Sequence, residues 1–143
     1  MHWAATGGQL MNEFWTVIRR WRDFAGRSSR REFWMYTLVI FIASIVLGAV
    51  DGFLFGAFEP APEGEAVIMP IVSFSNAFSL ITFIPGLSVS VRRLHDINRT
   101  GWWLLIALTV IGLLLIIYWA CVRSDEGDNQ YGVSPPATAR EAL

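Results

Sequence analysis

Three long apolar runs constrain this chain more than any other feature of its sequence. They cover residues 33–55, 70–91 and 102–122, and Asp51 is the one charged residue within them. A run of about 20 apolar residues is long enough to cross the hydrocarbon core of a bilayer as a helix. Charged residues make up 16% of the chain, against about 25% in soluble domains. The sequence therefore predicts an all-α membrane protein with three transmembrane helices over these ranges.

A shorter amphipathic segment, residues 12–24, precedes the first run. Phe14, Val17, Ile18 and Trp21 recur at helical spacing, and polar residues take the opposite face. Such a face with arginine beside it is typical of a helix lying in the membrane interface; the alternative is a soluble amphipathic helix packed on a domain. We expect residues 1–11 to form a loose tail, 12–124 a single membrane domain, and 125–143 a polar C-terminal tail.

All eleven basic residues are arginine, and their distribution predicts the topology. Six precede the first run, three lie in the link between the second and third, and none lies between residues 57 and 69. Short arginine-rich segments stay on the cytoplasmic side of a membrane. We therefore expect a multi-pass protein of the plasma membrane, with the N-terminus and the link inside and the C-terminal tail outside.

The same arginines form a candidate binding surface on the cytoplasmic face. Its members are Arg27, Arg30, Arg31, Arg92, Arg93, His95 and Arg99. Basic side chains near an anionic leaflet attract its headgroups, so the predicted partners are anionic lipids or a protein. The alternative is a simple topology signal in which Asp96 forms an ion pair with an arginine on the same helix.

A second candidate site lies within the membrane. Asp51, near the end of the first run, is expected at a similar depth to the polar face of the second run, which consists of Ser75, Asn76, Ser79 and Thr82. A charged group within a span usually faces the interior of the helix bundle. The alternative is that Asp51 lies close enough to the end of its helix to reach water.

Small residues recur at every fourth position of the first run, at Ser44, Gly48, Gly52 and Gly56. Such a ridge lets another helix approach closely, which predicts a packing face within the chain or between copies. Three spans bury little surface, so we expect a homo-oligomer.

The sequence offers no catalytic site, metal site or cofactor motif. Cys121 is the single cysteine, and His95 beside Asp96 forms neither a triad nor a set of metal ligands. The oxygen-rich tail after Ser124 lacks the spacing of a calcium loop. We expect neither an enzyme nor a nucleic-acid-binding protein.

Three segments carry a resemblance: FAGRSSRREFW (24–34), VRRLHDINRTGWW (91–103) and GDNQYGVSP (127–135). Through them the chain resembles a family of small bacterial inner-membrane proteins of unknown function, typified by YhaH. Ile97, Asn98 and Thr100 depart from the glycine and serine usual around the link. The resemblance implies an inner-membrane helix bundle and supplies no activity or catalytic residue.

The sequence leaves two functions open. In the first, an oligomer forms a conduit for an ion or small solute, lined by the polar face of the second run. In the second, the protein is a membrane-embedded scaffold or adaptor that binds lipid or protein through its arginines. A conduit needs these polar side chains on one continuous water-facing stripe, whereas a scaffold needs them only to be hydrogen-bonded between helices.

Overall fold

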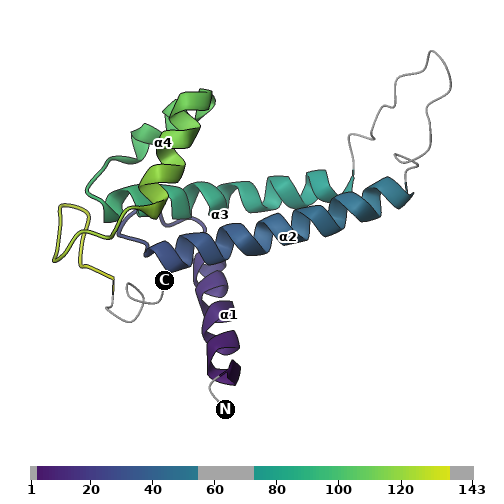
Figure 1. Ribbon diagram of the computed structural model, residues 1–143, viewed down its shortest axis with the longest axis horizontal. Coiled ribbons are helices and arrows are strands. Elements are labelled where there is room, and N and C mark those ends of the chain that lie inside the picture. The colour runs from purple at the N-terminus through teal and green to yellow at the C-terminus, as the bar shows by residue number, and fades with distance from the viewer. Residues whose placement is uncertain (1–2, 55–72, 136–143) are drawn as a thin grey trace.

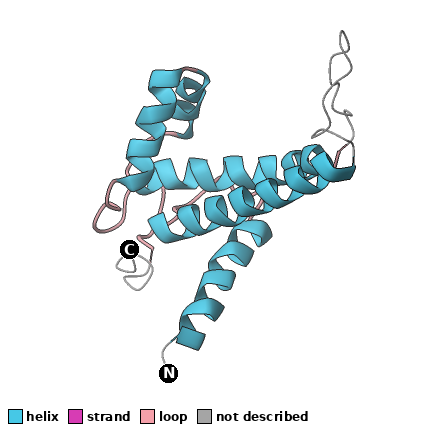
Figure 2. Ribbon diagram, turned by 45° about the vertical axis from the view of Figure 1, so that its right-hand side comes forward, coloured by secondary structure: helices cyan, strands magenta, loops and turns pink. Residues whose placement is uncertain are grey.

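The computed structural model describes residues 3–54 and 73–135, and the regular elements within these ranges are all helices. They are α1 (Trp3–Arg19), α2 (Arg30–Leu54), α3 (Phe74–Asp96), the 3₁₀ helix η1 (Gly101–Leu108) and α4 (Val110–Cys121). Helices α2 and α3 lie side by side as a long antiparallel hairpin (Figure 1). From one end of this hairpin α1 projects to one side and α4 to the other, as Figure 2 also shows. The architecture is a hairpin with two arms at one end.

The hairpin matches the first two predicted spans. With 25 and 23 residues, α2 and α3 extend about 38 Å and 35 Å, enough to cross a hydrocarbon core of about 30 Å. The most apolar 18-residue stretch has a mean hydropathy of 2.3 in α2 and 1.4 in α3, and only 11% and 17% of these stretches is buried within the chain. Exposed side chains such as Phe53, at 84%, are what a lipid-facing helix presents. Residues 70–72, assigned to the second span, lie outside the described residues.

The third run does not form one straight helix. The chain turns at Thr109, so that η1 packs back against α4, and α4 has only 12 residues. A helix of that length extends about 18 Å, which is too short to cross a bilayer alone. The hydroxyl of Thr109 accepts the backbone N–H of Gly112 at 3.0 Å and so caps a new helix where the apolar pattern continued without interruption.

The interfacial helix also differs from its prediction. It begins at Trp3 and ends at Arg19, so residues 3–11 are helical and residues 20–24 are not. Its Val17 is fully buried against Tyr36 of α2 and Val89 of α3, and these form the small apolar core. The core therefore lies where α1 crosses the hairpin, near the end that carries both arms.

Local sequence explains why the hairpin helices begin and end where they do. Ser29 caps α2 by accepting the N–H of Glu32 at 3.2 Å, as a serine followed three residues later by glutamate predicts. Helix α3 ends at Asp96, and Asn98 just after it has the left-handed conformation (φ 56°). The N–H groups of Asn98 and Arg99 return to the carbonyls of His95 and Leu94 at 3.0 and 2.9 Å. This is a Schellman stop, in which asparagine tolerates the positive φ that glycine usually supplies.

Candidate functional site

A network of buried charges closes the end of the hairpin from which the arms project. Its centre is Asp96, whose side chain has 0% exposure. One carboxylate oxygen accepts Nε of Arg27 at 3.0 Å, and the other accepts Nη1 of Arg93. Both arginine side chains are also buried. One carboxylate thus holds two guanidinium groups that belong to different segments of the chain.

Backbone carbonyls complete the coordination of these two arginines. Arg27 donates to the carbonyls of Asp96, Asp125 and Gly127 at 3.2, 2.7 and 2.6 Å. Arg93 donates to carbonyls at the end of α4, those of Trp119, Ala120 and Val122. The last carbonyls of a helix have no partner within it and carry partial negative charge. Arg27 therefore ties down the C-terminal tail, and Arg93 ties down α4.

A second buried pair joins the hairpin helices directly. Nη1 of Arg92 donates to Glu32 at 2.9 Å, and Arg92 has 0% exposure. Its Nε and Nη2 have no hydrogen-bond partner within the described residues. Nearby, the hydroxyl of Ser88 lies 2.6 Å from the carbonyl of Asp23 and 3.1 Å from that of Arg20. These contacts fix the segment after α1 to the side of α3.

His95 is the half-buried member of the cluster. Its Nδ1 lies 3.2 Å from the carbonyl of Gly26, and its ring stacks on Tyr131 with centroids 3.9 Å apart and planes 2° from parallel. The side chain of Asn129 donates to the carbonyl of His95 at 2.8 Å and accepts the N–H of Tyr131 at 2.9 Å. The tail thereby holds the stacked pair in register.

The predicted arginine surface divides into two sets. Arg27, Arg31, Arg92 and Arg93 are buried, so they do not form the open headgroup surface that the sequence predicts. Arg30 is half-buried, with Nη1 at 3.4 Å from the carbonyl of Cys121. Arg99 is exposed and lies over the ring of Trp119 at 4.3 Å. Buried carboxylates account for much of the difference, because Asp96 binds Arg27 and Arg93, and Glu32 binds Arg92.

The tail, predicted on the opposite side of the membrane from the link, contacts the link at its first described residues. Asp125 donates its N–H to the carbonyl of Asp96 at 3.1 Å, and Arg27 binds the tail at Asp125 and Gly127. The third apolar run turns at Thr109 and returns to the end of the hairpin from which it starts. The first described residues of the tail therefore share one end of the hairpin with the link.

The predicted intramembrane cluster exists in part. Asp51 is 2% exposed and accepts the backbone N–H groups of Phe74 and Ser75 at 3.0 and 2.8 Å, together with the hydroxyl of Ser75. The carboxylate therefore caps the N-terminus of α3, where free N–H groups favour an anion. Asn76 is exposed, and its backbone N–H donates to Ser73 at 3.3 Å. Asp51 thus connects the end of α2 to the start of α3.

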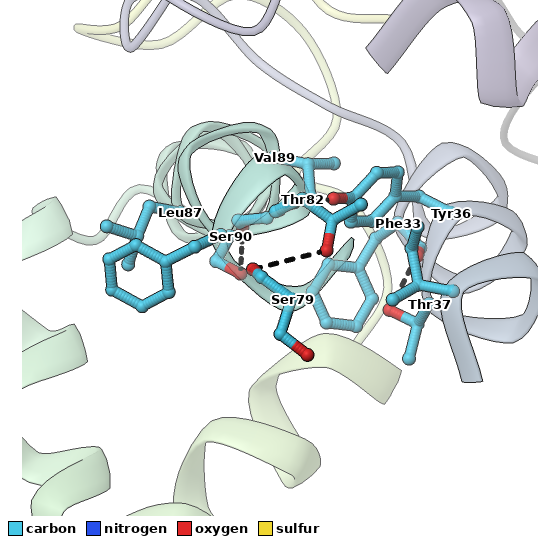
Figure 3. A pocket seen from close by; sticks show the side chains of 11 residues that line it. Phe33, Tyr36, Thr37, Ser79, Thr82, Leu87, Val89 and Ser90 are labelled. Carbon is cyan, nitrogen blue, oxygen red and sulfur yellow. Dashed lines mark hydrogen bonds between the residues drawn. The ribbon is translucent and has the colours of Figure 1, made fainter. Parts of the chain in front are cut away.

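The rest of the polar face of α3 borders a cavity of about 350 Å³ between α2 and α3. Figure 3 shows Thr37, Ser79, Thr82 and Ser90 around it. The hydroxyls of Thr82, Ser90 and Thr37 donate to carbonyls of their own helices, at 2.8, 2.7 and 2.9 Å. Tyr36 donates to the carbonyl of Thr82 at 2.6 Å. These bonds satisfy the hydroxyls of Thr37, Thr82 and Ser90 within the hairpin.

The predicted ridge of small residues is used unevenly. Gly52 is buried, and Ser44 and Gly48 are half-buried. A Cβ atom at Gly48 would meet nothing within 4 Å outside its own helix, so no neighbouring segment among the described residues approaches it closely. Gly56 lies outside the described residues. Packing of this ridge against a second copy remains a prediction.

A polar cavity of about 520 Å³ lies where α1, the start of α2 and the tail meet. Glu13 and Glu32 both line it, beside Arg20 and Arg27. Burial and the neighbouring Glu32 carboxylate raise the pKa of Glu13, and Arg31 opposes them. Glu13 is the member of this cavity whose ionisation the fold disfavours.

Several residues of the site were not singled out by sequence reasoning, chiefly Glu32, Ser88, Asn129 and Tyr131. The sequence contains a signal for Glu32, because it lies three residues after Ser29 in a capping box. Tyr131 lies in one of the three segments that carry the family resemblance. Within residues 3–54 and 73–135, no group of three or more His, Cys, Asp or Glu side chains is placed to hold a metal ion.

Those three segments meet in this site, Arg27 from the first, Arg93, His95 and Asp96 from the second, and Gly127, Asn129 and Tyr131 from the third. Residues 21–133 match a family described as proteins of unknown function, DUF805. The chain belongs to this family. It is 35% identical to the inner membrane protein YhaH of Escherichia coli K12 over 87% of this chain and 97% of that one. It is 31% identical to the inner membrane protein YhaI of the same organism, over 87% and 96%. No solved structure matches the chain.

The family match bears on both the membrane helices and the ion network. YhaH and YhaI are named as inner membrane proteins, in agreement with two helices long and apolar enough to cross a membrane. The match to DUF805 runs from Trp21 to Val133, so it begins after α1 and includes every segment that the network joins.

Proposed function

We propose that this DUF805 protein is a membrane-embedded scaffold that binds anionic lipid headgroups at the end of the hairpin that carries both arms. The observation that supports this most is the division of the arginines. Arg27, Arg92 and Arg93 are buried and build the platform, whereas Arg19, Arg22, Arg99 and Arg123 are exposed around it. A charge used to hold the fold together is unavailable to a ligand, so the exposed set carries the binding.

The surroundings of the exposed arginines suit a membrane interface. Arg22 lies over the ring of Trp21 at 4.3 Å, and Arg99 lies over Trp119 at the same distance. Trp21 is itself exposed. Tryptophan is enriched at the level of the headgroups, and an arginine resting on it keeps its charge at the same depth. Because α1 and the η1–α4 arm project sideways from the hairpin, this platform spreads along the membrane surface when the hairpin crosses it.

The scaffold is favoured over the conduit for a structural reason. Asp51 and Ser75 bind each other and the start of α3, and the hydroxyl of Thr82 binds its own helix. Side chains already committed in this way do not supply a continuous stripe for water or ions. The proposal assigns the protein no reaction, and it includes self-association through the ridge at Ser44 and Gly48.

The test is the preference of the full chain for phosphatidylglycerol over phosphatidylcholine in mixed bilayers, measured by quenching of tryptophan fluorescence with brominated lipids. Replacing Arg19, Arg22 and Arg99 by Gln removes three exposed charges, each worth about 1 kcal/mol near an anionic surface. The preference is expected to fall at least about tenfold. Added salt should weaken the wild-type preference, because exposed charges are screened.

The matched control changes the same three positions to Lys, which keeps the charge and removes the planar guanidinium. This variant should retain most of the preference, because attraction to the leaflet depends mainly on charge. A Gln variant that binds phosphatidylglycerol as well as wild type contradicts the proposal. So does a Lys variant that loses the preference as fully as the Gln variant.

A further inference from the structure

A second cavity, of about 670 Å³, lies beside the ion network and plays no part in the proposed headgroup binding. It opens between the end of α3, the start of η1, Phe24 and the tail, and most of its lining is apolar, including Val91, Leu104 and Leu105. Its volume falls within the range of about 300–1,000 Å³ that is usual for small-molecule sites. Cavities of this kind bind ligands when a few fixed polar groups orient them.

His95 and Tyr131 supply fixed polar groups in the lining. The Nδ1 atom of His95 lies 3.2 Å from the carbonyl of Gly26, which can only accept, so Nδ1 carries a proton. Above the ordinary histidine pKa of about 6.5, the ring is neutral and Nε2 is left as a hydrogen-bond acceptor. Stacking on Tyr131 and the bonds of Asn129 hold this ring in place. The acceptor is therefore positioned before any ligand arrives.

The lining also indicates the charge of the ligand. Among the described residues that line this cavity, none is Asp, Glu, Lys or Arg. Arg27 and Arg93 are turned to Asp96 and to backbone carbonyls. A carboxylate or phosphate would meet no opposite charge here and would lose its hydration. An uncharged head that donates a hydrogen bond matches Nε2 of His95 without that loss.

The position of the cavity indicates the rest of the ligand. Leu105 and Trp102, which line it, are 61% and 79% exposed, and Leu108 farther along η1 is 88% exposed. This continuous apolar surface lets a hydrocarbon chain enter from the bilayer and lie along Leu104 and Leu105. We propose that the cavity binds one uncharged single-chain amphiphile, of the monoacylglycerol class, whose hydroxyl donates to Nε2 of His95.

The experiment uses the full chain in lipid nanodiscs at pH 7.5 and a monoacylglycerol with a photoreactive diazirine in its acyl chain. Cross-linked residues are mapped by mass spectrometry. Labelling is expected at Val91, Leu104 and Leu105, and unlabelled monooleoylglycerol should compete about tenfold better than oleate or lysophosphatidylglycerol, the margin expected from one hydrogen bond together with the penalty for burying a charge.

Two variants and a control complete the test. Leu104→Trp fills the cavity and should abolish the labelling, whereas Leu108→Trp adds the same side chain on the exposed surface of η1 and should leave it unchanged. His95→Phe keeps the stacked ring but removes the acceptor, and should lower labelling about tenfold. Circular dichroism confirms that each variant is folded, and if His95→Phe is not, Leu104→Trp decides.

Three outcomes overturn the proposal. The first is labelling spread over the exposed faces of α2 and α3 and unaffected by Leu104→Trp, which indicates ordinary bilayer contact. The second is equal competition by oleate or lysophosphatidylglycerol, which indicates a charged lipid instead. The third is a folded His95→Phe variant that labels as strongly as wild type, which removes the hydrogen bond from the site.

Discussion

Replacing Asp96 by Asn should weaken the contacts that hold α4 and the tail against the hairpin, and so lower the free energy of unfolding. The substitution keeps the shape of the side chain and removes the charge that faces Arg27 and Arg93. At an effective dielectric constant of 20, one pair of charges about 4 Å apart is worth about 4 kcal/mol. Desolvation of the groups cancels much of the sum, and deletion of one partner of a buried pair costs about 3–5 kcal/mol. Because backbone carbonyls also hold both arginines, we expect the lower part of that range, about 3 kcal/mol.

The chain contains its own matched control in Asp23. Asp23 pairs with Arg20 at the same i, i+3 spacing that separates Asp96 from Arg93. The side chains of Asp23 and Arg20 are, however, each 39% exposed. Exposed pairs contribute about 0–1 kcal/mol. Asp23→Asn should therefore lower the free energy of unfolding by less than about 1 kcal/mol, although it also removes a carboxylate charge that faces an arginine.

The assay is equilibrium unfolding of the full chain in mixed micelles with increasing sodium dodecyl sulfate, followed by circular dichroism. Hydrogen exchange of residues 123–131 gives a second readout, because the N–H of Asp125 is bound to the carbonyl of Asp96 and should exchange faster when the tail is released. If Asp96→Asn proves no more destabilising than Asp23→Asn, the network does not hold α4 and the tail in place, and the reasoning is wrong.

Two further predictions concern the corner of the third apolar run and the polar cavity. Gly112→Ala places a Cβ 1.8 Å from the carbonyl oxygen of Ile106 and should destabilise the chain by at least about 3 kcal/mol in the same unfolding assay. Gly8→Ala, in the interior of α1, meets nothing within 4 Å and should stabilise it by about 0.5–1 kcal/mol. Equal effects of the two variants on the free energy of unfolding would contradict the tight turn at Thr109. Because burial and Glu32 raise the pKa of Glu13, the folded state binds its proton more tightly than the unfolded state, and stability falls as the pH rises through the raised value. Glu13→Gln should therefore match wild type well below the ordinary pKa of 4.5 and exceed it at neutral pH; a constant difference across that range would contradict the assignment.

Local features of the fold followed from the sequence, because helices and their ends depend on neighbouring residues. Hydropathy predicted the bounds of α2 to within three residues. It predicted the position of α3 less closely, because the helix begins at Phe74 and continues past the predicted end to Asp96. The capping sequence that begins at Ser29 is a local signal for the start of α2 at Arg30, three residues before the predicted start. The first segment was less well predicted, since residues 3–11 lack a clear apolar period and are nevertheless helical in α1.

The tertiary structure alone decided what the arginines do. The bond from Arg27 to Asp96 joins residues 69 positions apart, and that from Arg27 to Gly127 joins residues 100 apart. No local pattern encodes such a pair, so a sequence rich in arginine looks the same whether its charges face lipid or one another. The turn at Thr109 is decided in the same way, because apolar composition is unchanged across it. Composition thus determined a helical membrane protein, and long-range ion pairing determined that its most distinctive segments build its interior.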